Sequence, residues 1–471
     1  MRLPAFSVCR TIGTALLLFF AAGVHAPAAA PAPGRNALPP PSPAATQQTR
    51  FTVPPGFTVQ LVADETQIQK PMNLAFDEAG RLWTTGSSLY PFPARTDALG
   101  RPIATWETEW HDMKGSIGQA KPPPPPAAHD SVRILSDFDA HGRARRVQVF
   151  ADGLIIPIGV LPLPRPPPAK GDTAIVFSIP SIWRLEDTDG DGRADRREEH
   201  YTGFGFVDTH GMSSNYLHGL DGWIYGCHGF NNRSEVRDRA GRVTVVESGS
   251  TYRFRPDGSA FEIYTHGQTN PFGLTVDHWG DLYSADSHSK PVYLLLPGAF
   301  YEGINKQHDG LGFAPAITND NHGSTSIAGI AYYAAETFPA EFHENVFIGN
   351  PVTQRLNRDR FEWDGSTPRV IRLPDFLTCS DPWFRPVQVK LGPDGALYVA
   401  DFYTPIIGHY EHPLLDPRRD RTHGRIWRIV APGTPGPARD LPSSVDGLLA
   451  ALGDSNLTRR TLAAQALVAH G

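Results

Sequence analysis

The sequence is poor in cysteine, and one cysteine motif is missing altogether. Only three cysteines occur among the 471 residues, and none belongs to a Cys-x-x-Cys-His motif. A c-type haem therefore has no covalent attachment site within this chain. Once the leader segment inferred below is removed, Cys227 and Cys379 remain. They belong to different repeats of the chain, so we expect two buried thiols, with a disulfide between them as the alternative.

A large excess of charge of either sign is also missing. The formal net charge is -6, the isoelectric point is near 6.3, and no long basic run is present. These features argue against a nucleic acid as the partner of the protein. The chain does contain 45 Gly and 45 Pro, a composition that fits a loop-rich all-β protein.

Long apolar runs are equally scarce. The only one, residues 11–24, follows Arg2 and Arg10 and is too short for a comfortable transmembrane helix. It predicts a signal peptide over residues 1–30, followed by a disordered Ala/Pro-rich linker over residues 31–50. The protein is therefore expected in the periplasm, at the cell surface or outside the cell, with membrane contact only through an uncleaved signal.

A repeated unit accounts for most of the chain. Each copy is a short apolar strand, a tight turn and a second strand rich in Leu, Tyr and Trp; residues 270–286 and 385–401 are the clearest copies. This pattern is typical of a β-hairpin. The six turns lie near Gly80, Gly171, Gly222, Gly280, Asn345 and Gly395. The last five are spaced by 50 to 65 residues, which is the period of a four-stranded propeller blade.

The sequence thus predicts an all-β fold, a six-bladed β-propeller over residues 51–430. The strand at residues 57–63 should pair with residues 425–430, because the last blade would otherwise have an open edge. After a linker at residues 431–444, residues 445–471 predict two amphipathic helices that resemble the first repeat of a HEAT-type array. A single such repeat cannot bury its apolar face, so we expect a longer protein.

An acidic loop between two predicted strands has the spacing of a calcium-binding loop. Counting from Asp187, carboxylates occupy positions 1, 3, 5, 9 and 12, and Gly192 occupies position 6. The alternative is an ordinary Asp/Gly-rich turn with solvated carboxylates. The predicted calcium site comprises Asp187, Asp189, Asp191, Arg193 through its carbonyl, Asp195 and Glu198.

Polar residues also cluster where the predicted blades begin. Because the first strand of each blade lines the central channel, the loops that lead into these strands should meet on one face. His210 or His322 could act there as a general base, and Arg385 could bind an anionic group. Asn270 lies at the start of the first strand of another predicted blade. The alternative is that these side chains only hydrogen-bond the inner turns.

Several of these segments resemble the soluble quinoprotein glucose/sorbosone dehydrogenase family of six-bladed propellers. Its Arg-Asn-Pro-x-Gly-Leu pattern is similar to residues 269–274, with Thr269 in place of the arginine. Residues 329–333, 338–339 and 392–398 are similar to later motifs of the family. The resemblance covers most of the predicted propeller. It implies the oxidation of sugars, with pyrroloquinoline quinone (PQQ) as the cofactor.

A narrower resemblance is to the large bacterial proteins of the "membrane-bound dehydrogenase" or PVC-type haem-binding CxxCH class. It is carried by residues 185–195, 208–210, 383–386 and 401–413. In that family the propeller precedes HEAT repeats and a haem-binding Cys-x-x-Cys-His module. The resemblance implies a periplasmic or surface redox role, with a C-terminal haem domain or a separate cytochrome as partner.

The sequence therefore favours an exported dehydrogenase-like propeller that oxidises a carbohydrate or alcohol and passes electrons to a haem module outside this chain. His210 would be the base, Arg385 a second catalytic residue, and Asn270 and His322 would hold the cofactor. The alternative is a non-catalytic propeller, stabilised by calcium, that binds a glycan or a protein at its mouth. A propeller can serve either purpose, so the fold alone does not decide between them.

Overall fold

The computed structural model describes residues 39–91, 130–164, 170–304, 306–408, 412, 416, 418–437 and 440–470, and the backbone of strands β5 (Arg95–Thr96) and β6 (Pro102–Ile103). The predicted signal peptide lies outside the described residues. The chain divides into two units, residues 1–40 and 41–471. The second unit contains every element discussed below.

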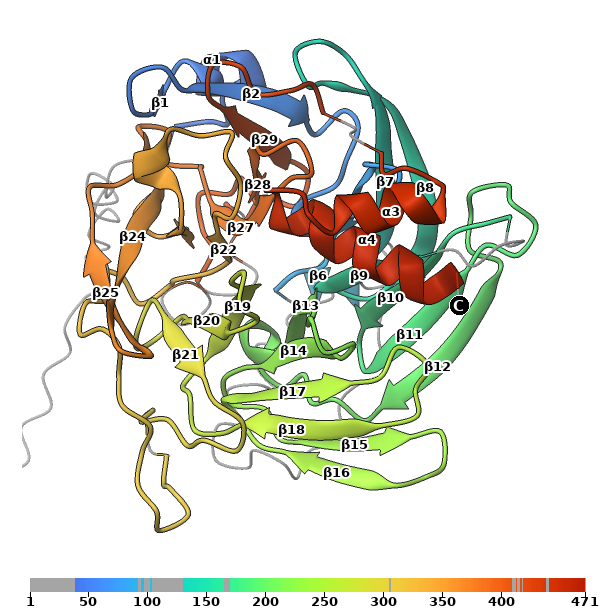
Figure 1. The fold of residues 1–471 in the computed structure, drawn as a ribbon, viewed down its shortest axis with the longest axis vertical. Helices are drawn as coiled ribbons and strands as arrows, with labels where there is room; N and C mark the ends of the chain where they lie inside the picture. Colours follow the sequence, from blue (N-terminus) through green and yellow to red (C-terminus); the bar gives the residue numbers. More distant parts are fainter. Residues whose placement is uncertain are drawn as a thin grey trace, which may run out of the picture. The chain divides into compact units, whose positions relative to one another are not determined.

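Six inner strands form a ring around a common axis in this unit, and Figure 1 shows their arrangement. Each of them contacts the next one along the chain, and the last contacts the first, so that the ring is closed. They are β3 (Pro71–Phe76), β9 (Gly159–Leu163), β13 (Ser213–His218), β19 (Pro271–Val276), β22 (Ile330–Tyr332) and β27 (Pro386–Leu391). The predicted six-bladed β-propeller is confirmed.

Each inner strand forms an antiparallel hairpin with the strand that follows it. The partners are β4 (Leu82–Gly86), β10 (Thr173–Ser178), β14 (Ile224–His228), β20 (Leu282–Asp286), β23 (Asn345–Asn350) and β28 (Leu397–Asp401). All six predicted turns lie in these hairpins. In the β19–β20 turn, Asp277 Oδ1 accepts from the backbone N–H groups of Trp279 and Asp281, and Gly280 adopts a φ of 95°. Asp and Gly at these positions therefore fix the turn.

Further strands complete the blades outward from the axis. They are β7 (Asp130–Phe138), β8 (Ala144–Leu154), β11 (Ser181–Glu186), β12 (Arg196–Thr202), β17 (Ser250–Phe254), β18 (Phe261–Thr265), β21 (Tyr293–Leu295), β24 (Arg355–Asp364), β25 (Thr367–Arg372) and β26 (Leu377–Cys379). The hairpin of β15 (Ser234–Asp238) and β16 (Val243–Val246) lies in the chain between β14 and β17 of the third blade. It does not join their sheet, because β15 pairs with β12 at the edge of the second blade. The sequence repeat does not predict this exchange.

The ring is closed by strands from opposite ends of the propeller. Strand β2 (Thr58–Ala63) pairs with β29 (Arg425–Val430), and both belong to the sheet of β27 and β28. This is the predicted closure. The guanidinium of Arg428 on β29 connects the two ends of the propeller. Its Nε donates to Asp394 Oδ2 at 2.8 Å, and its Nη1 donates to Gln60 Oε1 on β2 at 2.6 Å.

The predicted disorder of residues 31–50 is wrong for the part that the structure describes. Helix α1 (Ala44–Gln48) precedes β1 (Phe51–Thr52), which pairs with β26. Gln47 is fully buried, and its Nε2 donates to Asp401 Oδ2 at 2.8 Å. A single buried glutamine thus anchors a segment whose Ala/Pro-rich composition favours disorder.

Two helices follow the propeller, as the sequence predicts. They are α3 (Val445–Ala451), capped by the Ser444 side chain, and α4 (Leu457–His470), which lies over the centre of the propeller in Figure 1. The α4 segment is fixed by the Leu457 N–H, which donates to the Ala334 carbonyl at 2.9 Å. The continuation into a HEAT array stays a prediction. None of the helices within the described residues has the length and apolar character needed to cross a bilayer.

Cys227 and Cys379 are both free thiols. Cys227 is buried on β14, and burial raises its pKa well above the ordinary value. Cys379 is partly exposed on β26. The structure therefore agrees with two thiols rather than with a disulfide.

Candidate functional site

A cavity of about 420 Å³ opens at the end of the propeller where the chain enters the inner strands. Two kinds of loop build it, those that lead into inner strands and those that follow the second strand of each hairpin. Its polar lining includes Asp208, His210, Asn270, His288, Arg385 and His412. Three of the four predicted catalytic and cofactor-binding residues therefore line one cavity, although up to 175 positions separate them in the sequence.

His210 is held in a short 3₁₀ turn, η1 (Thr209–Gly211), which Asp208 caps through a 2.9 Å hydrogen bond from the His210 N–H. Its Nε2 lies 3.1 Å from the Ile407 carbonyl oxygen. A carbonyl only accepts hydrogen bonds, so Nε2 carries the proton of the neutral ring and Nδ1 is the basic atom. Burial lowers the pKa of His210 to about 4. The ring is therefore neutral at pH 7 and competent to accept a proton.

Arg385 presents a buried cation to the same cavity. Its side chain donates to three backbone carbonyls, those of Pro351, Phe384 and Pro405, at 3.0 to 3.2 Å. Its Nε–H is buried and has no hydrogen-bond partner among the described residues. Burial lowers the pKa of Arg385 to about 10, while the more distant Asp401 and Asp381 oppose this shift.

The guanidinium consequently stays charged at neutral pH. Within the part of the chain that the structure describes, no carboxylate forms an ion pair with it. A buried cation whose hydrogen bonds go to neutral carbonyls can still bind an anionic or strongly polar oxygen.

Asn270 is oriented by its neighbours. Its backbone N–H donates to Asp286 Oδ2 at 3.0 Å, and its Oδ1 accepts from the Phe230 N–H at 2.9 Å. With Oδ1 engaged, Nδ2 is the group through which this side chain can donate to a ligand. Thr269, which precedes it, is fully buried, and its hydroxyl accepts from the Ile304 N–H at 3.1 Å. Thr269 therefore stabilises a loop and does not line the cavity.

His322 does not reach the cavity. It is buried, and its Nε2 lies 2.9 Å from Asp359 Oδ2 on the outer strand β24. The loop before β22 is long, and at His322 it packs against the outer part of its own blade. Thr325 and Ser326 of this loop line the cavity instead. The sequence-based assignment of His322 to the cofactor site has no support from this geometry.

Aromatic and imidazole side chains in the cavity were not predicted from the sequence. Tyr90 follows β4 and packs on the His210 ring, with ring centroids 5.0 Å apart. His288 follows β20 and packs near Phe230, with centroids 5.6 Å apart. The predicted catalytic and cofactor-binding residues all precede inner strands. The residues that follow each second strand, such as those after Asp286, are equivalent positions on the same face and could have been found from the repeat.

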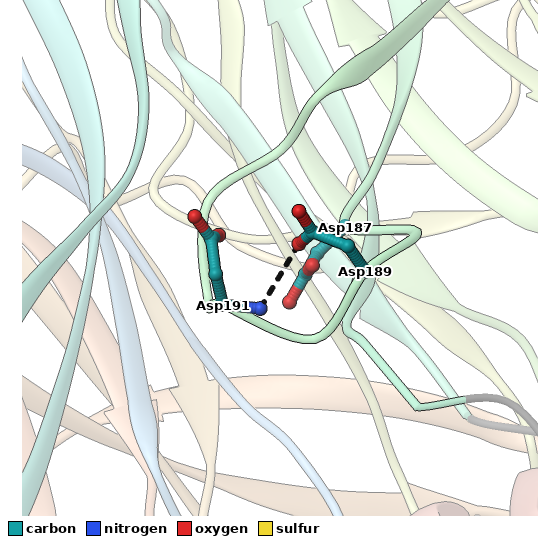
Figure 2. A group of neighbouring side chains, drawn as sticks. All are labelled: Asp187, Asp189 and Asp191. Atoms are coloured by element: carbon teal, nitrogen blue, oxygen red, sulfur yellow. Dashed lines mark hydrogen bonds between the residues drawn. The ribbon is translucent and has the colours of Figure 1, made fainter.

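The acidic loop lies elsewhere, between β11 and β12, and shares no residue with the cavity. Figure 2 shows Asp187, Asp189 and Asp191, whose carboxylate oxygens come within 4.8 Å of one another. Asp187 is buried, and its two oxygens accept from the N–H groups of Gly190 and Gly192 at 2.7 and 2.9 Å. Three of the predicted calcium ligands are thus close together.

The other predicted ligands have different partners. Asp195 accepts from the backbone and hydroxyl of Thr188, at 3.0 and 2.6 Å. Glu198 lies on β12 and forms an ion pair with Arg239. The side chain of Arg193 pairs with Asp152 at 2.8 Å. Calcium binding by this loop stays a prediction, and the three aspartates are its core.

We expect calcium to raise the melting temperature of the protein, because the ion would offset the repulsion among the three aspartates. At a calcium concentration one hundred times the dissociation constant, the free energy of unfolding should rise by about 2.7 kcal/mol. Thermal melting with calcium and with a chelator measures the effect. The Asp189→Asn/Asp191→Asn variant should lose it, and Asp364→Asn, which changes an exposed carboxylate in another blade, should keep it. Equal melting temperatures with calcium and chelator would reject the site.

Comparison with known proteins places most of the chain in one family. The sequence pattern of the family described as "Domain of unknown function (DUF7133)" matches residues 43–432. No curated protein sequence matches the chain.

Several solved structures are similar to it. A glucose dehydrogenase is 17% identical, with a TM-score of 0.50, over 79% of this chain and 99% of that chain. An oxidoreductase (glucose dehydrogenase) of Thermus thermophilus is 18% identical, with a TM-score of 0.49, over 80% and 100%. The PQQ-bound aldose sugar dehydrogenase of Streptomyces coelicolor is 16% identical, with a TM-score of 0.46, over 80% and 99%. At such identities the similarity concerns the fold.

Proposed function

Because the chain belongs to the DUF7133 family, whose description names no activity, we propose its function from the cavity at the propeller mouth: the oxidation of a carbohydrate or alcohol hydroxyl. The observation that carries the proposal is the presence in one cavity of a neutral imidazole and a buried guanidinium that has no carboxylate partner among the described residues. The first can accept a proton, and the second can bind an oxygen that carries negative charge.

His210 and the apolar walls of the cavity have different roles in this oxidation. Oxidation of a CH–OH group to a carbonyl removes one proton and one hydride. His210 accepts the hydroxyl proton at Nδ1, while its Nε2–H stays bonded to the Ile407 carbonyl. The apolar walls of the cavity, which include Phe230 and Ile407, exclude water from the reacting carbon.

The hydride needs an acceptor, and PQQ is the one that the fold family implies. The chemistry that PQQ would supply, when bound, is the acceptance of this hydride. The buried Nε–H of Arg385, which lacks an acceptor among the described residues, fits a carboxylate of such a molecule. Arg385 and Asn270 would hold the group. Thr269, where the quinoprotein pattern has an arginine, would not contribute to this contact.

We extend the proposal to the location of the protein and to the partner that receives the electrons. The protein would be exported to the periplasm or the cell surface, and electrons would leave for a haem module outside this chain. Calcium at the acidic loop would have a structural role, since that loop and the cavity share no residues.

Dye-linked oxidation of a panel of aldoses and alcohols, with and without added PQQ and calcium, tests the proposed activity. We expect dye reduction that depends on the substrate and increases with PQQ. Absence of turnover across the panel, together with measurable binding of a glycan or a protein at the mouth, would replace the enzyme by the alternative binding module.

The Arg385→Met variant should need an about 10- to 150-fold higher concentration of PQQ or substrate for half-saturation. The reason is that a hydrogen bond to a charged group contributes about 1.5–3 kcal/mol. Saturation curves of the dye-linked reaction measure this change, and thermal melting separates it from a loss of folding. Arg360→Met is the matched control, since Arg360 is half-exposed and pairs with the equally exposed Glu362. Unchanged saturation in a folded Arg385→Met protein would remove Arg385 from the site.

A further inference from the structure

A second cavity lies at the other end of the inner strands, between these strands and helix α4. Its volume is about 130 Å³. Arg385, which directly precedes β27, and Val387 on β27 line the mouth cavity, whereas Lys390 and Leu391 at the end of β27 line this second cavity. The two cavities share no lining residue. The second cavity therefore lies outside the site to which the dehydrogenase function is assigned.

Most of the second cavity is apolar, but it contains one ammonium group. The inner strands contribute aliphatic and aromatic side chains, among them Leu74, Phe76 and Ile330, and α4 adds Leu457 and Leu462. Lys390 is the only Lys or Arg among the described residues that line it. An isolated ammonium in such surroundings is unfavourable unless an acceptor or an anion compensates it.

Lys390 has no such compensation within the described part of the chain. No hydrogen bond or ion pair joins its Nζ to another described residue, and the only titratable group that affects its pKa is the buried thiol of Cys227, which is neutral at pH 7. Lys70 provides the contrast. It is fully buried, and its Nζ donates to the carbonyls of Tyr403 and His423 at 3.0 and 2.9 Å and lies 3.7 Å from Asp420. Lys390 is only partly buried, and it has no comparable partner among the described residues.

The protonation state of Lys390 suits an anionic ligand. Burial lowers its pKa to about 8, so most of the molecules still carry the ammonium at pH 7. On the facing helix, Thr461 and Gln465 line the same cavity and can donate hydrogen bonds. The cavity is close in size to one of about 150 Å³ that binds benzene in another protein.

We propose that this second cavity binds a small monocarboxylate whose apolar body is about the size of a benzene ring. The carboxylate pairs with Lys390, and the body packs between the inner strands and α4. The inference does not depend on the dehydrogenase activity. Because α4 forms one wall, the ligand also strengthens the attachment of the C-terminal helices to the propeller, which already includes the hydrogen bond from Asn456 Nδ2 to the Gly392 carbonyl at 2.8 Å.

Benzoate is a suitable probe, and benzyl alcohol is its neutral counterpart. Calorimetric titration of the full chain should detect benzoate binding, with at least tenfold weaker binding of benzyl alcohol. The Lys390→Met variant should lose at least tenfold in benzoate affinity, and its melting temperature without ligand should equal or exceed that of the wild type. Lys170→Met, which removes an exposed lysine, is the matched control and should bind benzoate normally.

A second variant keeps the proposal falsifiable if Lys390→Met does not fold. Gln465→Glu places a carboxylate of the protein in the cavity, where it should pair with Lys390, raise the melting temperature and exclude benzoate. The proposal is overturned if the wild type does not bind benzoate, if benzyl alcohol binds equally well, or if folded Lys390→Met or Gln465→Glu binds benzoate as tightly as the wild type.

Discussion

Replacing His210 by Gln is expected to lower kcat/KM of the oxidation by about 10²- to 10⁴-fold, the contribution that a positioned general base usually makes. The glutamine can still donate a hydrogen bond to the Ile407 carbonyl, as Nε2 of His210 does at 3.1 Å. The variant therefore removes the basic Nδ1 while retaining the contact that holds the loop. Its melting temperature should stay close to that of the wild type.

The pH profile separates a chemical role of His210 from a structural one. Burial lowers the pKa of its ring to about 4, so the ring is protonated below this pH and cannot accept a proton. In the wild type, kcat/KM should rise as the pH increases through about 4 and then stay level to pH 7. The residual activity of His210→Gln should lack this rise. His308→Ala, a change on an exposed loop, is the control, and a rise that persists in His210→Gln would show that another group is the base.

Removing the carboxylate of Asp394 should have the largest effect on stability. Asp394 and Arg428 form an ion pair at 2.7 Å, and their side chains are 0% and 3% exposed. Tyr398 also donates to this carboxylate, at 2.9 Å. Asp394→Ala leaves a buried guanidinium without its anion, so we expect a loss of about 3–5 kcal/mol in the free energy of unfolding. Urea denaturation, followed by circular dichroism, measures this loss.

Two further variants test the reason for this loss. Arg360→Ala breaks the exposed pair of Arg360 and Glu362 and should cost less than about 1 kcal/mol. Asp394→Leu combined with Arg428→Met removes both buried charges and should recover much of the stability. If Asp394→Ala unfolds at the same urea concentration as the wild type, the ion pair does not stabilise the closure between β2 and β29.

Most of the fold could be predicted, because the tight turns of the propeller require particular residue types that can be recognised in the sequence. Turns such as Asp277 to Gly280 require a side-chain acceptor and a residue that tolerates positive φ, and the sequence supplies both. The apolar strands at the two ends of the propeller also predict their own pairing. Helix α1 could not be predicted, because it depends on the buried Gln47, whose partner Asp401 is 354 residues away.

The site was predictable only in part. His210, Asn270 and Arg385 each precede an inner strand, and the propeller symmetry brings such positions to one face. His322 occupies the same kind of position, but its long loop carries it to Asp359 instead. Loop length, and not residue type, decides which of these side chains reaches the mouth.

The central claim is that the mouth cavity is where the hydroxyl group is oxidised. A crystal structure of the protein soaked with PQQ and with a sugar or alcohol from the active panel tests this claim most directly. We predict ligand density in the mouth cavity, with an anionic oxygen in contact with Arg385 and a substrate hydroxyl within hydrogen-bond distance of His210 Nδ1. Density at another face, or an empty mouth in crystals that still turn over the substrate, would contradict the account.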